Sequence, residues 1–379
     1  MKKILEAIGI TILKFFANFI YLFLKCMPTK NRIVMISRQS NNITLDFSLL
    51  RDKINELDNN VELKILCHKL EEGIKNKIKY CFYILKIMYY LATSKVCVLD
   101  GYCIPASILK HKKKLKIIQI WHASGAIKKF GYQILDKKEG SNSEIAKLMC
   151  MHKNYNYIIA PSKITGEIFA EAFNTPIEKV VQLGLPRLEY IVNKKYDLTE
   201  QIYKEYPKLK SKENILYIPT FRKDNKINLV EELLKAEIDK EKYNLIISLH
   251  PLDDTIVPEE YLIDKKYSSF DLIKIADYII TDYSALSIEA SLLEKPVFLY
   301  VPDYEEYVKN RGLNISFDKE LKTFTSKKIS DIMTKIEKKD YDMKELIAYK
   351  NKYVNVDSST SISDLSRYLL KIVGSNNLW

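Results

Sequence analysis

Short apolar runs separated by longer segments of helical pattern make up the chain from residue 32 onward. The runs are rich in β-branched and aromatic residues, as strands are, and each separating segment is long enough for a crossover helix. The expected strands are Arg32–Ser37, Leu63–Cys67, Val96–Leu99, Ile117–Trp121, Tyr157–Ala160, Ile215–Pro219, Leu245–Leu249, Tyr278–Thr281 and Val297–Val301. This alternation is typical of parallel sheets with helices on both faces, so we predict an α/β protein.

The strands fall into two series, separated by the charged stretch 193–214, which has no alternating pattern. A chain of 379 residues fits two domains better than a single core. We therefore predict two Rossmann-like doubly wound domains that face a cleft, covering residues 31–205 and 206–379. Ligands of such sheets bind at the carboxyl ends of the strands, and the candidate residues below lie at those ends.

The segment that precedes the first domain, residues 1–30, is apolar from Ile4 to Leu24 and has basic residues on both sides. Its polar residues recur at helical spacing and predict one polar stripe on an apolar helix; they are Thr11, Lys14, Asn18 and Lys25. A signal peptide would need a better cleavage site than the one present. A membrane-spanning helix and a helix docked on the protein's own core are alternatives. The basic flanks favour an amphipathic anchor that lies on an anionic membrane surface.

The chain carries a net charge of +12, which suits anionic partners such as nucleic acid, acidic lipid or phosphorylated substrates. Its lysines are dispersed without a long basic block, which argues against a nucleic-acid partner. The six cysteines show neither a Cys-x-x-Cys pair nor zinc-site spacing. We therefore expect free thiols in a reducing, cytoplasmic compartment and no metal site.

The first candidate for chemistry is His122, directly after the fourth expected strand. Small residues follow it, and Gly125 can adopt backbone angles that let the chain approach a ligand closely. A catalytic base suits this position, although a lone histidine is often structural. Ser124 is an alternative hydrogen-bonding group, and Lys128 could hold a phosphate or could simply be solvated.

Three further positions carry cationic or polar side chains. Arg187 follows the apolar run 180–183 and could offer its guanidinium to a phosphate, or could be a surface arginine in a turn. Thr220 and Arg222 follow the first strand of the second series. His250 follows the second strand, so each domain has one histidine at a strand end, and the pair could share acid–base and phosphate-binding roles.

A last cluster closes the strand Tyr278–Thr281 and opens an expected helix that runs through Leu293. Thr281, Asp282 and Ser284 are good capping residues, so plain capping is one interpretation. The other is that the amino terminus of the helix receives a phosphate. Glu289 could then accept hydrogen bonds from a ribose diol, and Asp282 could orient a histidine.

Taken together, these segments resemble the CDP-glycerol glycerophosphotransferase family, which builds teichoic acids on the cytoplasmic membrane face of Gram-positive bacteria. The matching stretches are residues 119–131, 218–222, 249–251, 281–284 and 295–304. Length and the apolar amino terminus look most like the wall teichoic acid glycerophosphate primase branch. Residues 184–187 look more like the polymerase branch, and Ser248 stands where relatives often have a basic residue. A poly(glycerol phosphate) or capsule polymerase, a CDP-ribitol transferase and a nucleotide-sugar glycosyltransferase stay open as alternatives.

The resemblance implies a GT-B-like fold with an acceptor-side first domain and a CDP-glycerol-binding second domain. It implies transfer of glycerol phosphate from CDP-glycerol to a hydroxyl of an undecaprenyl-diphosphate-linked saccharide, with release of CMP and without a tightly bound cofactor or metal. His122 would be the general base, and His250 the second catalytic residue. The implied substrate-binding residues are Trp121, Ser124, Gly125, Lys128, Arg187, Pro219, Thr220, Arg222, Thr281, Asp282, Ser284 and Glu289. The enzyme would be peripheral, on the cytoplasmic face of the membrane.

Overall fold

The computed structural model describes residues 2–70, 73–220, 229–236, 238–249, 255–261 and 266–375. The chain divides into two compact units. Unit 1 contains residues 1–124, 130–187 and 356–379, and unit 2 contains residues 125–129 and 188–355. The last 24 residues thus belong to unit 1, a five-residue segment after His122 belongs to unit 2, and the main change of unit falls at residue 188. The expected domains, with their boundary at residue 206, stay a prediction.

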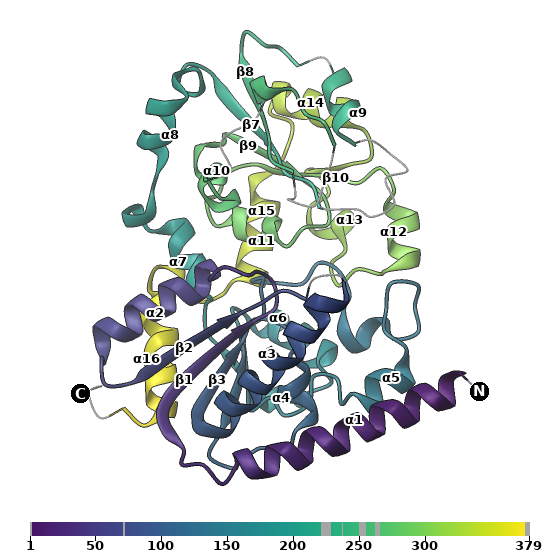
Figure 1. The fold of residues 1–379 in the computed structure, drawn as a ribbon. Helices are drawn as coiled ribbons and strands as arrows, with labels where there is room; N and C mark the ends of the chain where they lie inside the picture. Colours follow the sequence, from purple (N-terminus) through teal and green to yellow (C-terminus); the bar gives the residue numbers. More distant parts are fainter. Residues whose placement is uncertain are drawn as a thin grey trace. The chain divides into compact units, whose positions relative to one another are not determined.

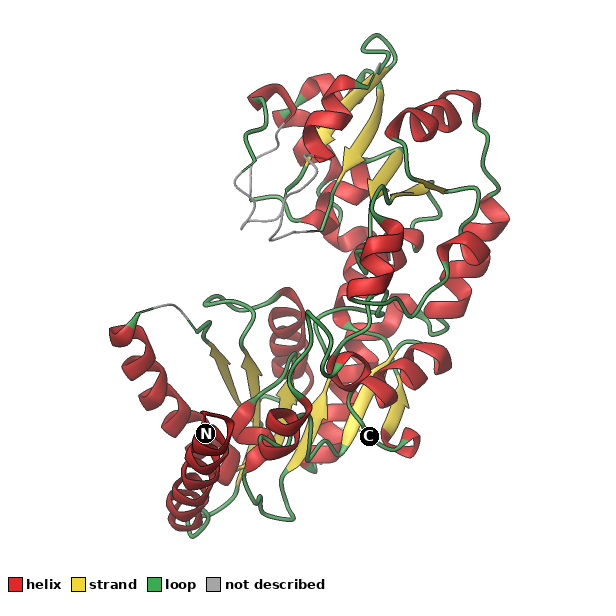
Figure 2. Cartoon of the chain, turned by 90° about the vertical axis from the view of Figure 1, so that its right-hand side faces the viewer, coloured by secondary structure: helices red, strands yellow, loops and turns green. Residues whose placement is uncertain are grey.

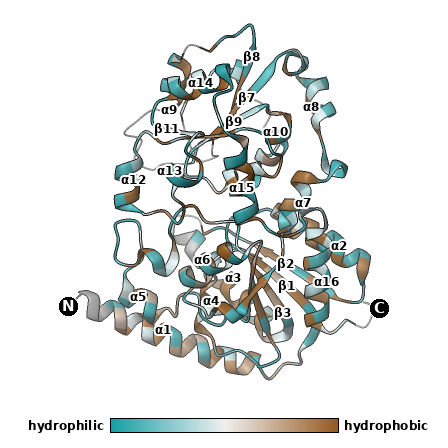
Figure 3. Ribbon diagram, turned by 180° about the vertical axis from the view of Figure 1, so that it is seen from behind, coloured by the Kyte–Doolittle hydropathy of each residue, from teal (hydrophilic) through white to brown (hydrophobic). Residues whose placement is uncertain are grey.

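Unit 1 contains a parallel sheet of six strands in the order β2-β1-β3-β4-β5-β6. Figure 1 labels β2, β1 and β3 of this sheet. The strands are β1 Lys30–Ser37, β2 Glu62–Cys67, β3 Ser94–Leu99, β4 Lys116–Gln119, β5 Tyr157–Ala160 and β6 Val180–Gln182. Five were expected from the sequence, and β6 was not. The first three strands are strongly hydrophobic (Figure 3), as expected of a sheet that is covered on both faces.

Helices cover both faces of this sheet (Figure 2). On one face, α2 (Leu45–Leu57) and α16 (Ser361–Val373) pack against β1, β3 and β4 in a single apolar cluster. Phe47, Leu50 and Ile54 follow one another at helical spacing on α2, and the same face of the sheet receives the carboxyl-terminal apolar stripe of α16. The burial of that stripe explains why the end of the chain joins unit 1. Helix α3 (Ile74–Thr93) contacts β1 and β3 as well.

Unit 2 contains a parallel sheet of five strands in the order β11-β10-β9-β7-β8. Its strands are β7 Glu213–Tyr217, β8 Tyr243–Ile247, β9 Tyr278–Thr281, β10 Val297–Tyr300 and β11 Thr325–Ser326. Four were expected, and the two-residue β11 was not. The prediction of an α/β protein with two parallel sheets is therefore confirmed, while the cleft between two facing domains stays a prediction.

The remaining α-helices connect these strands or flank the sheets. They are α1 Lys2–Leu24, α4 Ile104–Ile108, α5 Ser143–Leu148, α6 Lys163–Ala172, α7 Pro186–Val192, α8 Thr199–Glu205, α9 Leu229–Lys235, α10 Ser269–Ile275, α11 Leu286–Ser291, α12 Tyr304–Asn310, α13 Phe317–Glu320, α14 Ile329–Lys338 and α15 Met343–Tyr353. Helix α8 lies in the stretch 193–214 that separates the two series of strands.

Helix α1 docks on unit 1 through its polar stripe. The Lys14 ammonium donates to the Leu148 carbonyl at 2.6 Å, and the Asn18 amide donates to the Ile108 carbonyl at 3.1 Å. Tyr21 on the same side is fully buried. The exposed large apolar side chains of the helix are Ile8, Ile12, Leu13, Phe15, Phe16, Phe19, Ile20, Leu22 and Phe23. The helix therefore presents its apolar side outward, which is the reverse of a helix docked on the core.

Residues Glu6–Leu24 of α1 have a mean hydropathy of 1.9. Within the described part of the chain, this is the single helix long and apolar enough to cross a membrane. Length and composition are thus compatible with a membrane helix, while Lys14 and Asn18 of the polar stripe bond to other parts of unit 1.

Candidate active site

The expected catalytic histidine lies at the carboxyl edge of the unit 1 sheet, in the loop that follows β4. Its neighbour Trp121 has a backbone φ of 61°, in the left-handed region that bulky residues rarely adopt. The Trp121 indole stacks on Phe130 with ring centres 4.7 Å apart, and its centre lies 4.2 Å from that of the His122 ring. Strained backbone of this kind persists only where packing holds it, and it is concentrated at functional sites.

The His122 ring is held through Nδ1. The Asp100 carbonyl oxygen lies 3.0 Å from this nitrogen, and the Gln39 amide nitrogen lies 3.3 Å from it. A carbonyl oxygen can only accept, so the shorter contact places the proton on Nδ1, and the Gln39 NH2 group then cannot donate to the same nitrogen. In that tautomer Nε2 carries a lone pair, and none of the described residues hydrogen-bonds to it. Nε2 is thus the atom that could take a proton from a substrate.

Surrounding protein also keeps the His122 ring neutral. The side chain has exposed surface, yet loss of hydration lowers its pKa to about 4, and the Arg187 guanidinium adds to this effect. The Asp100 carbonyl and the Asp46 carboxylate oppose the shift. At neutral pH the imidazole is unprotonated, as a general base must be before it acts.

Asp100, which sequence reasoning missed, lies directly after β3 and is 2% exposed. Neither of its carboxyl oxygens accepts a hydrogen bond from any described residue. Burial raises the pKa of this carboxyl to about 7. The nearby Ser37 side chain opposes this rise, although its geometry does not meet that of a hydrogen bond. Asp100 lies in an Asp-Gly pair that reads as an ordinary turn in the sequence, so the one available signal was its position at a strand end.

Arg187, expected to meet a phosphate, is engaged within unit 1. Its Nε donates to the Asp46 carboxylate at 2.9 Å, its Nη2 contacts the same oxygen, and its backbone N–H donates to the other oxygen at 2.9 Å. Nη1 donates to the carbonyl of His122 at 2.7 Å. The Asp46 side chain is 2% exposed and that of Arg187 is 12% exposed. These contacts make Arg187 a support for the loop that carries His122.

The residues that follow His122 divide between the units. Ser124 is fully buried in unit 1, whereas Gly125 and Lys128 belong to unit 2. The segment 125–129 pairs with residues 312–314 through bonds from Lys129 N–H to Gly312 O at 3.1 Å and from Asn314 N–H to Ile127 O at 2.8 Å. A Cβ atom on Gly125 would lie 2.3 Å from Cδ1 of Ile288 in α11. A larger residue at position 125 would therefore need the Ile288 side chain to move.

The carboxyl ends of β7 and β9 in unit 2 bring three of the expected residues together. The Thr220 N–H and hydroxyl both donate to one oxygen of Asp282, at 2.9 and 2.5 Å. The Thr281 hydroxyl donates to the Ile218 carbonyl at 2.7 Å. Asp282 is 1% exposed, and Pro219 is half-buried next to Thr220. Asp282 thus holds Thr220, three residues after the end of β7.

The expected helix at residues 284–293 is shorter in the structure. Helix α11 spans Leu286–Ser291, and the Ser284 hydroxyl accepts from the N–H of Leu286 at 3.3 Å. Ser284 lies one residue before the N-cap residue Ala285 and makes only this local bond, and the helix ends two residues early because Leu292 and Leu293 already form the turn into β10. Glu289 is 3% exposed. Arg222 and His250 lie outside the described residues.

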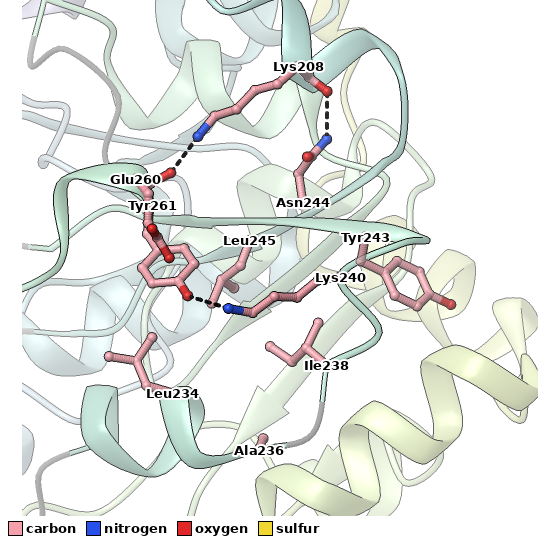
Figure 4. A pocket seen from close by; sticks show the side chains of 10 residues that line it. All are labelled: Lys208, Leu234, Ala236, Ile238, Lys240, Tyr243, Asn244, Leu245, Glu260 and Tyr261. Atoms are coloured by element: carbon pink, nitrogen blue, oxygen red, sulfur yellow. Dashed lines mark hydrogen bonds between the residues drawn. The ribbon is translucent and has the colours of Figure 1, made fainter.

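A pocket of about 210 Å³ lies elsewhere in unit 2, at the amino end of β8 (Figure 4). Its lining includes Lys208 and Lys240. The Lys208 ammonium donates to the Glu260 carbonyl at 2.6 Å, and that of Lys240 donates to the Tyr261 hydroxyl at 3.4 Å. Because parallel sheets bind ligands at their carboxyl edge, this pocket is at the wrong end of the sheet for the expected site.

Comparison with known proteins gives a consistent result. The model of the CDP-glycerol:poly(glycerophosphate) glycerophosphotransferase family matches residues 19–371. A teichoic acid ribitol-phosphate primase of Bacillus spizizenii is 30% identical over 355 residues, which cover 89% of this chain and 90% of that protein. A teichoic acid glycerol-phosphate primase of Bacillus subtilis is 32% identical over 247 residues, 61% of this chain and 62% of that protein. The solved structure of the wall teichoic acid polymerase TagF has a TM-score of 0.74 at 19% identity and covers 98% of this chain and 97% of that chain, so it shares the fold.

Proposed function

The chain belongs to the CDP-glycerol:poly(glycerophosphate) glycerophosphotransferase family, and we propose that it transfers glycerol phosphate from CDP-glycerol to a lipid-linked saccharide in teichoic acid synthesis. An acceptor hydroxyl oxygen attacks the glycerol-bearing phosphorus, and the bond between that phosphorus and the CMP oxygen breaks. Nε2 of His122 takes the hydroxyl proton, and CMP leaves as an anion. The observation that carries this proposal is the His122 ring, which is neutral and held through Nδ1 at a strand end.

The donor-binding residues of this proposal lie in unit 2. The Asp282–Thr220 bonds hold Thr220 in place, and Arg222 follows Thr220 by two residues in the sequence. Arg222 and His250 neutralise the diphosphate of the donor in this proposal. The other residues proposed to bind the nucleotide of the donor are Pro219, Thr281, Ser284 and Glu289.

On the acceptor side, Trp121, Ser124, Gly125 and Lys128 keep their proposed substrate contacts. Arg187 takes a different place, because its guanidinium already binds the Asp46 carboxylate and the His122 carbonyl. We propose that the main role of Arg187 is to hold the loop that carries His122, and that any contact of its guanidinium with a substrate phosphate comes second to this role.

Ribitol phosphate is the second candidate for the transferred group. It is favoured by the near full-length match to a ribitol-phosphate primase. The two donors differ by two carbons of the alditol, and measurement of CMP release from CDP-glycerol and from CDP-ribitol separates them. Faster release from CDP-glycerol at equal concentration supports the first proposal, and faster release from CDP-ribitol supports the second.

We propose primase-like activity, in which one unit is added, since the chain spans 90% of a primase. Mass spectrometry of the product from a lipid-linked disaccharide acceptor tests this directly. A single added unit supports a primase, and a ladder of products supports a polymerase.

We also propose that α1 holds the protein on the anionic cytoplasmic surface of the membrane. Its phenylalanine side chains are exposed, with Phe15 67% and Phe23 62% exposed, and such side chains insert into the interface of a bilayer. Replacement of both by glutamate should release the protein from anionic vesicles. Ile256 in unit 2 is 92% exposed and provides a matched control, since Ile256→Glu should leave sedimentation with vesicles unchanged. Retention of the double variant on vesicles would rule out this anchoring.

A further inference from the structure

A buried amide joins the two loops that hold His122. Gln119 is the last residue of β4 and is fully buried. Its Nε2 donates to the carbonyl of Gly101 at 3.1 Å, and its Oε1 accepts from the N–H of Trp121 at 2.9 Å. Gly101 is the neighbour of Asp100, whose carbonyl binds Nδ1 of His122, and Trp121 is the neighbour of His122 itself. The Gln119 side chain thus bonds to Gly101, next to Asp100, and to Trp121, next to His122.

A third contact fixes the orientation of this amide. Nε2 also donates to the hydroxyl of Tyr155 at 3.0 Å, and that hydroxyl lies 2.9 Å from Nδ1 of His152. Burial lowers the pKa of His152 to about 3, so its neutral ring can accept the Tyr155 proton. A flipped amide would set its NH2 group against the N–H of Trp121 and its oxygen against the Gly101 carbonyl. The observed orientation is the one that satisfies all three partners.

The Trp121 contact holds a strained residue in place. A φ of 61° at a tryptophan is retained only if the surroundings hold it. Trp121 receives such support from Gln119 at its N–H and from Phe130 at its ring. Relaxation of this residue would rotate the peptide that leads into His122 and would alter the distance from Nδ1 to the Asp100 carbonyl.

We propose that Gln119 is the positioning residue that sets the orientation and the tautomer of His122, by tying the loop after β3 to the loop after β4. Gln119 contacts neither reacting atoms nor substrate in this proposal, and it acts through Trp121 and the Asp100–Gly101 loop. The proposal rests on the proposed role of His122 as the base.

The test compares Gln119→Leu, which keeps the approximate volume and removes all three hydrogen bonds, with a control at the other end of the same strand. There, the Asn156 side chain accepts from the N–H of Ile117 at 2.8 Å, so Asn156→Ala also removes a side-chain cap of β4. The assay is CMP release from CDP-glycerol and from CDP-ribitol with a lipid-linked disaccharide acceptor. Circular dichroism confirms that each variant is folded.

Gln119→Leu should lower kcat on the order of a hundredfold, as expected when a catalytic group is displaced by about 1 Å, with KM for the donor nearly unchanged. The acid limb of its kcat/KM profile should move to higher pH, because a displaced and better hydrated His122 ring regains a pKa nearer to its ordinary value. Asn156→Ala should keep the wild-type kcat and pH profile. A purely structural role for Gln119 would leave the pH profile unmoved.

Gln119→Met is a second variant, which keeps an unbranched side chain of similar length and lacks the amide that donates to Gly101 and accepts from Trp121. It should show the same shift of the acid limb. Wild-type kcat and pH profile in either folded Gln119 variant would overturn the proposal. His122→Ala distinguishes failure of the Gln119 proposal from failure of the proposed function. If His122→Ala is active, His122 is not the general base. If His122→Ala is inactive while the Gln119 variants behave as the wild type, only the positioning role of Gln119 is refuted.

Discussion

The buried carboxyl of Asp100 should make the protein less stable as the pH rises. Its folded-state pKa is raised from 3.8 to about 7, so between these values the folded state binds more protons than the unfolded state. Stability from this group is fully present below the unfolded pKa and is lost as the pH rises through the folded pKa. A shift of about 3 units corresponds to about 4 kcal/mol, of which about 2 to 3 kcal/mol should be lost between pH 5 and pH 8.

The assay is urea unfolding at pH 5 and pH 8 for the wild type and for Asp100→Asn. Asparagine has nearly the same shape and does not titrate, so subtraction removes the contributions of the other groups. Relative to the variant, the wild type should lose about 2 to 3 kcal/mol over this interval. A difference between the two proteins that stays constant with pH would refute the reasoning, because it would mean that the carboxyl has an ordinary pKa or a partner in the folded state.

Two further predictions concern the contacts around the site. Asp46→Ala should lower the free energy of unfolding by about 3 kcal/mol in urea titration, because it leaves the guanidinium of Arg187 buried without its carboxylate. The control is Asp52→Ala, which removes an exposed ion pair and should lower the free energy of unfolding by less than about 1 kcal/mol. Equal losses in the two variants would contradict this account. Gly125→Ala should cost about 1 to 3 kcal/mol through overlap with Cδ1 of Ile288, and Ile288→Val should restore part of the loss in the double variant. Additive losses in that double variant would show that the overlap is not the cause.

The strands could be predicted from the sequence where they are long and apolar. All nine expected strands are present, because strands of four to eight residues that are rich in apolar side chains leave a clear pattern. Strands β6 and β11 have three and two residues and are partly exposed, so no periodicity identifies them. The placement of α16 in unit 1 could not be predicted either, since an apolar stripe does not specify which sheet will cover it.

The candidate site could be predicted only where residue type and strand end coincide. His122, Thr220 and Asp282 were predicted in this way, and the structure shows what each contacts. The Asp100 carbonyl is a backbone group and leaves no sequence signal, although it sets the tautomer of His122. Gln119 reads as an ordinary strand residue, because its importance lies in contacts with loops that are distant in the sequence.

The most direct test of the central claim is the rate of CMP release by His122→Ala, measured with each CDP-alditol and a lipid-linked disaccharide acceptor. Folding of the variant is checked by circular dichroism and by donor binding. Loss of the general base should lower the rate by roughly a hundredfold or more while donor binding is retained. Release of CMP at near the wild-type rate by folded His122→Ala would contradict the account.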